Sequence, residues 1–226
     1  MLDAPVRRVL DPVLAGVAAA IDRPGITPDR LTVAGLVLGL GSAGAAAAGL
    51  WPLALVLWLV SRVADGLDGT LARRRRATIA ATSAGVVGSE SGPGSATVGR
   101  ASEAGGFLDI VADFVVYGAT VVGVAVGVTT AFDAPWWPFL LVLFAYYVNG
   151  TAFLAFSSIA ERTGRTLDDG RSLSFLGRIA EGTETIVVHS AWLILPFVAW
   201  QIAAVWALFV VASAVQRIVS GYRRLR

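Results

Sequence analysis

The chain has 226 residues, of which 56% are hydrophobic and only 15% are charged, with a formal net charge of +2. Together with a mean hydropathy of +0.71, this composition excludes a soluble globular domain and predicts an integral membrane protein. All 18 basic residues are arginine, in short clusters beside apolar segments. Such clusters favour contact with anionic lipid headgroups and argue against nucleic-acid binding.

A helix needs roughly 20 apolar residues to cross a membrane, so the chain has room for about six crossings. We therefore predict an all-α, polytopic membrane protein whose single domain spans residues 1–226. Residues 1–30 are expected to form an interfacial N-terminal segment, with an amphipathic helix over 4–22, because Arg7, Arg8 and Asp11 interrupt its apolar residues.

Six transmembrane helices are predicted in chain order, at 31–50, 51–73, 104–128, 138–159, 183–200 and 202–220. The first has a small residue every fourth position, which predicts close helix packing: Gly35, Gly39, Ala43 and Ala47. Residues 77–101 are rich in Ala, Ser, Gly and Thr and predict a flexible cytoplasmic loop insertion with weak helix at its ends.

Charge and aromatic residues predict the orientation in the membrane. With these crossings every arginine falls on one side, and the opposite connections carry only Asp133. The positive-inside rule then places both termini in the cytoplasm. Tryptophans near the far interface are typical of an aromatic belt: Trp51, Trp136, Trp137, Trp200 and Trp206.

Acidic residues occur at the cytoplasmic ends of two consecutive crossings, in the stretches ADGLDGTLARRRR (64–76) and GGFLDIVAD (105–113). Ionisable groups in a membrane span are functional candidates because they are expensive to bury. Asp65 and Asp68 are three residues apart, and Asp109 and Asp113 are four apart, so each pair lies on one helix face.

Four facing carboxylates would repel one another strongly unless cations lay between them. Oxygen ligands without His or Cys suit a hard ion such as Mg²⁺, Mn²⁺ or Ca²⁺. Gly69 and Gly105 leave space beside the acids, and Arg73 can donate to a phosphate. These residues together indicate a phosphate-bearing substrate at a membrane-edge metal site.

The same positions resemble the signature of the CDP-alcohol phosphatidyltransferase family, D-x2-D-G-x2-A-R followed by G-x3-D-x3-D. All eight fixed residues are present: Asp65, Asp68, Gly69, Ala72, Arg73, Gly105, Asp109 and Asp113. The family usually has about eight residues between the arginine and the next glycine, whereas residues 74–104 intervene here.

The resemblance implies a role for each of these positions. Asp65, Asp68, Asp109 and Asp113 would bind metal, with two Mg²⁺ or Mn²⁺ ions expected, and Asp113 would also act as the catalytic general base. Gly69, Ala72 and Gly105 would line the cytidine nucleotide pocket, and Arg73 would hold a phosphate.

The implied reaction belongs to phospholipid biosynthesis. An acceptor hydroxyl attacks the β-phosphorus of CDP-diacylglycerol, which releases CMP. The partners would be CDP-diacylglycerol, an alcohol acceptor and membrane lipids, with no nucleic acid, and we expect a homodimer in the cell membrane.

The acceptor is left open by the sequence. Arg171 and Arg178 slightly favour a phosphorylated acceptor such as glycerol 3-phosphate or an inositol phosphate, although both arginines could equally contact lipid headgroups. Glu181, Thr185 and His189 form a polar stripe that could line the acceptor side, and His189 is assigned no role. The alternatives are a CDP-choline or CDP-ethanolamine phosphotransferase that uses diacylglycerol, and a non-enzymatic membrane cation-binding or transport protein.

Overall fold

The computed structural model describes residues 3–23, 25–84, 93–163 and 182–226. Within these ranges the chain is helical, with seven α-helices, one short 3-10 helix and no strand. The elements are α1 (Asp3–Ile21), α2 (Pro28–Ala47), α3 (Trp51–Ala84), α4 (Pro93–Phe132), α5 (Trp137–Arg162), α6 (Gly182–Ile194), η1 (Pro196–Val198) and α7 (Ala199–Leu225).

Four stretches of the described chain are long and apolar enough to cross a membrane, within α2, α4, α5 and the η1–α7 unit. Their ranges are Pro28–Ala47, Glu103–Phe132, Trp137–Arg162 and Pro196–Leu225. The all-helical polytopic membrane class therefore agrees with the prediction, whereas six crossings remain a prediction. Neither α3 nor α6 is among these four stretches: α3 contains several charged residues, and α6 has only 13 residues.

The start of α2 follows from local sequence. Thr27 caps the helix, because its side-chain oxygen accepts a hydrogen bond from the Arg30 backbone N–H at 3.3 Å. Pro28 occupies the first helical position and Asp29 lies in the first turn, where a negative charge is favoured. At the other end Gly49 adopts φ 74°, which lets the chain turn directly into α3.

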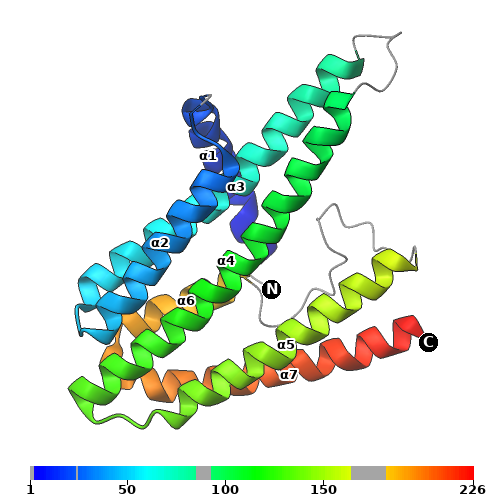
Figure 1. The fold of residues 1–226 in the computed structure, drawn as a ribbon. Helices are drawn as coiled ribbons and strands as arrows, with labels where there is room; N and C mark the ends of the chain where they lie inside the picture. Colours follow the sequence, from blue (N-terminus) through cyan, green and yellow to red (C-terminus); the bar gives the residue numbers. More distant parts are fainter. Residues whose placement is uncertain (1–2, 24, 85–92, 164–181) are drawn as a thin grey trace.

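Helix α2 packs against both α3 and α4, and α5 packs along α7 (Figure 1). The two groups meet where α4 leads into α5 and diverge toward the opposite end (Figure 1). Close approach within the first group depends on small residues. A Cβ on Gly39 would lie 2.5 Å from Val116 of α4, and one on Gly123 would overlap the Ala43 carbonyl of α2. The small-residue face predicted for the first crossing is therefore confirmed as a packing surface.

The segment expected to be a loop over 77–101 is helical over much of its length. α3 continues through Ala84 and α4 begins at Pro93, and residues 85–92 lie outside the described residues. Alanine is the strongest helix former, and four of the eight residues 77–84 are alanine, which favours the extension of α3. The long ends of α3 and α4 run beyond the rest of the bundle (Figure 1).

Two further expectations are corrected by the structure. The fifth crossing does not reach residue 200: α6 ends at Ile194, and η1 and α7 follow, because Pro196 has no backbone N–H to continue the helix. Trp206 does not belong to an interfacial belt. It is 6% exposed, and its indole N–H donates to the Tyr146 hydroxyl at 2.7 Å.

Candidate active site

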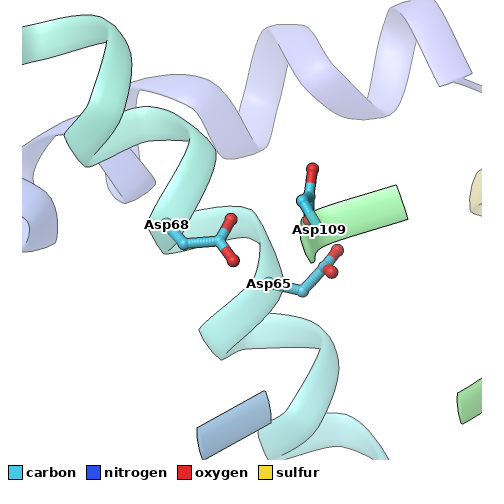
Figure 2. Close-up of side chains that lie close together, drawn as sticks. All are labelled: Asp65, Asp68 and Asp109. Atoms are coloured by element: carbon cyan, nitrogen blue, oxygen red, sulfur yellow. The ribbon is translucent and has the colours of Figure 1, made fainter. Parts of the chain in front are cut away.

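Three acidic side chains from α3 and α4 converge at one place in the bundle. One oxygen of each of Asp65, Asp68 and Asp109 lies within 4.8 Å of the others. Figure 2 shows the carboxylates turned toward one another, two from α3 and one from α4. Two unit charges at that spacing repel by roughly 3–4 kcal/mol at an effective dielectric constant near 20. The cluster therefore favours a cation among its oxygens.

These residues fit a divalent metal ion by their chemistry and position. All the ligand atoms are carboxylate oxygens, which suit Mg²⁺ and Mn²⁺. Asp68 is only 4% exposed, and the side chain of Asp65 is 32% exposed. A half-buried group of this kind can hold an ion on one side and still leave positions open to a ligand.

Thr32 of α2 fixes one carboxylate of the cluster. Its hydroxyl donates a 2.6 Å hydrogen bond to Oδ2 of Asp68, and Thr32 is itself buried. A partner that orients a metal ligand in this way typically affects metal affinity by about 10–100-fold. The sequence does not predict the contact of Thr32 with Asp68, because the two residues are 36 positions apart and no local pattern connects them.

Asp113, the fourth acid of the motif, is engaged differently from the other three. Its Oδ1 forms a 2.6 Å ion pair with Nη1 of Arg62, and it is not part of the three-carboxylate group. Arg62 lies on α3, and the same nitrogen is 3.8 Å from Oδ1 of Asp65. The positive-inside rule uses arginines only as markers of the cytoplasmic side and assigns Arg62 no role at a site. The sequence signal for such a role is that Arg62 precedes the acids, inside the apolar run.

The two motif glycines have close neighbours within the chain. A Cβ on Gly105 would lie 2.9 Å from Oδ1 of Asp29, at the start of α2. A Cβ on Gly69 would lie 3.3 Å from Nη1 of Arg73, so the exposed guanidinium of Arg73 folds back over that glycine. The space that these glycines were expected to leave for a ligand is therefore bordered by the side chains of Asp29 and Arg73. Ala72 is half-buried on α3, next to Arg73.

His189 lies in a buried aromatic cluster. It is fully buried, its Nε2 is 3.0 Å from the Tyr146 hydroxyl, and its ring stacks on Trp192 with a centroid distance of 4.4 Å. Arg171, Arg178 and Glu181 lie outside the described residues.

Comparisons with known proteins identify the relatives of the chain, although no protein-family model matches it. The inner membrane protein YnjF of Escherichia coli (strain K12) is 34% identical over 206 residues, which cover 88% of this chain and 84% of that protein. The chain belongs to the YnjF family. Like YnjF, it is therefore a membrane protein, in agreement with its apolar helices.

A solved structure shares the fold of this member of the YnjF family. The crystal structure of Mycobacterium tuberculosis phosphatidylinositol phosphate synthase with CDP-DAG bound matches with a TM-score of 0.56. The match covers 95% of this chain and 92% of that chain, at 19% sequence identity. At this identity the similarity establishes a shared fold.

Proposed function

We propose that this chain is a divalent-metal-dependent CDP-alcohol phosphatidyltransferase of phospholipid biosynthesis, acting at the cytoplasmic face of the cell membrane. The observation that carries the proposal is the convergence of both motif halves, with Asp65, Asp68 and Asp109 within 4.8 Å of one another. The shared fold with a synthase whose crystal structure contains CDP-DAG supports the same substrate class.

The reaction would join an acceptor alcohol to a lipid phosphate. The acceptor oxygen attacks the β-phosphorus of CDP-diacylglycerol, and the bond from that phosphorus to the CMP oxygen breaks. A divalent ion bound by the three carboxylates would polarise the diphosphate and stabilise the leaving oxygen. The chain's own contribution is mainly orientation and electrostatic complementarity, as in phosphoryl transfer generally.

Three residues at this site then have distinct tasks. Thr32 orients Asp68 as a ligand through its 2.6 Å hydrogen bond. Arg73, exposed beside Gly69, would donate to a substrate phosphate. Asp113 uses one oxygen for Arg62, and its second oxygen would accept the proton that the acceptor hydroxyl loses.

A phosphorylated alcohol, such as glycerol 3-phosphate or an inositol phosphate, is the acceptor class that we propose. The support is the arginine content of residues 164–181, which include Arg171 and Arg178, although these residues lie outside the described ranges. A homodimer and cytoplasmic termini belong to the same proposal.

The test is CMP release by the purified full-length chain in lipid nanodiscs. CDP-diacylglycerol, Mg²⁺ and a panel of acceptors are supplied, and the lipid product is identified by mass spectrometry. We expect CMP release that needs both Mg²⁺ and an acceptor. No CMP with any acceptor, under conditions in which a known phosphatidyltransferase is active, would refute the proposal.

A single substitution sharpens this test. Asp113→Asn preserves the size of the side chain but cannot take up the acceptor proton. We expect it to abolish CMP release while CDP-diacylglycerol still binds. Turnover near the wild-type rate would remove Asp113 from the mechanism.

A further inference from the structure

Arg62 places a fixed positive charge between the carboxylates of α3 and α4. It precedes Asp65 by three residues, and its side chain is only 6% exposed. Its Nη1 is 2.6 Å from Oδ1 of Asp113 and 3.8 Å from Oδ1 of Asp65. The guanidinium therefore links an acid on each helix.

The surroundings hold this guanidinium in place. Its central carbon lies 5.2 Å from the ring centroid of Trp58 and 4.9 Å from that of Tyr117, distances at which a cation is attracted to an aromatic face. Its Nη2 donates to Oγ of Ser61 at 3.2 Å, and that oxygen in turn donates to the carbonyl of Gly35 at 2.8 Å. Three helices thus contribute to one buried cation position.

Charge and geometry restrict what else can bind beside Asp113. The Asp113 oxygen that Arg62 contacts is then already occupied by a cation. An ion that bridged Asp113 and Asp65 would lie within a few ångströms of the guanidinium, where two positive charges repel. Asp65, Asp68 and Asp109 form a group to which Asp113 does not belong, with one oxygen of each within 4.8 Å of the others.

We infer that the Arg62 guanidinium takes the place of a second divalent cation, so that the site holds one ion among Asp65, Asp68 and Asp109. The inference rests on the proposed function and specifies its metal requirement. It departs from the two ions, and from the metal-binding role of Asp113, that the motif alone implies. Asp113 is then a carboxylate held by the protein and not by metal.

Metal stoichiometry tests this inference without any measurement of activity. Purified protein in nanodiscs is titrated with Mn²⁺, and free Mn²⁺ is followed by electron paramagnetic resonance. We expect one bound Mn²⁺ per wild-type chain. Arg62→Met should bind two, because the excluded position opens, whereas Arg62→Lys keeps the charge and should bind one. Arg76→Met, at an exposed position on the same helix, serves as the control and should bind one.

Two tightly bound Mn²⁺ ions per wild-type chain would overturn the inference, as would a single ion in folded Arg62→Met. If Arg62→Met does not fold, Asp113→Asn replaces it. This variant should bind one Mn²⁺ with wild-type affinity, and a tenfold weaker affinity would overturn the inference.

CMP release in the same preparations separates the two proposals. Two Mn²⁺ ions with CMP release would overturn the inference and leave the proposed function standing. One Mn²⁺ without CMP release would overturn the proposed function.

Discussion

Two polar clusters of the molecule are built in opposite ways. Around Asp65, Asp68 and Asp109, like charges face one another. Around His189 the groups are neutral: the Trp206 indole N–H donates to the Tyr146 hydroxyl, which also contacts His189. The difference indicates different roles for the two clusters. Neutral groups can form hydrogen bonds with one another inside the protein, whereas facing carboxylates repel one another and favour a bound cation.

The largest effect is expected when one carboxylate of the charged cluster is replaced. Asp68→Asn should reduce CMP release by more than about 100-fold, because it replaces a metal-ligand carboxylate by a neutral amide. The melting temperature without divalent ions should stay the same or rise, since repulsion inside the cluster falls. Activity is measured in nanodiscs and melting by the loss of helical circular dichroism.

The control for this prediction is Asp133→Asn, which changes an exposed acid in the turn between α4 and α5. Its backbone has φ 52°, a conformation that Asn also tolerates, so the fold should not change. Equal activity in Asp68→Asn and Asp133→Asn would contradict the assignment of the charged cluster as the metal site.

A smaller effect is expected when only the support of the cluster is removed. Thr32→Val keeps the shape of the side chain but deletes the hydrogen bond to Asp68. Apparent Mn²⁺ affinity should fall by about tenfold or more, in the range typical of groups that orient a metal ligand. The matched control is Thr129→Val, which removes a 3.0 Å bond to the Ala134 carbonyl far from the acids. Similar Mn²⁺ affinities in both variants would show that Thr32 has no orienting role.

A substitution in the neutral cluster should lower the free energy of unfolding and leave the activity unchanged. Tyr146→Phe leaves the Trp206 indole and His189 without their shared partner, which should cost about 1–3 kcal/mol of unfolding free energy. CMP release per folded molecule should stay near wild type. Unfolding is followed in mixed micelles, with Tyr147→Phe as the control, because Tyr147 is 72% exposed. A selective loss of activity in Tyr146→Phe would end the distinction between the clusters.

The smallest effect concerns an ion pair between Asp22, which follows the end of α1, and Arg75 of α3. The hydrogen bond from Arg75 and its charge lower the pKa of Asp22. A lowered pKa means that the stabilisation is present above the unfolded pKa, near pH 4, and is lost as pH falls through the folded pKa. Asp22→Asn should lower the melting temperature slightly at pH 7, and this difference should shrink in acid.

Exposed ion pairs are weak and are screened by salt, so added NaCl should also reduce the Asp22 effect. Asp11→Asn, at an exposed position of α1, provides the control. A difference between wild type and Asp22→Asn that grew toward low pH would contradict the assigned ion pair.

Local spacing explains what the sequence could predict about this molecule. Asp65 and Asp68 share a face of α3 because they are three residues apart. Asp109 and Asp113 share a face of α4 because they are four residues apart. The apolar composition predicted an all-helical membrane protein, and the small residues of α2 predicted its close contacts. Each of these inferences uses residues that are neighbours along one helix.

What could not be predicted depends on contacts between helices. The contact of Thr32 with Asp68 joins α2 to α3, and that of Arg62 with Asp113 joins α3 to α4. Trp206 appeared interfacial by its place in the sequence, but packing against α5 buries it beside Tyr146. Helix rotation and crossing set these contacts, and hydropathy along a single chain contains neither quantity.

The most direct test of the central claim is to locate Mn²⁺ by anomalous scattering in crystals of the wild-type chain grown with the ion. The account predicts one anomalous peak per chain, within coordination distance of carboxylate oxygens from Asp65, Asp68 and Asp109. A wild-type structure with no peak among these three carboxylates, at a Mn²⁺ concentration that supports CMP release, would contradict the account.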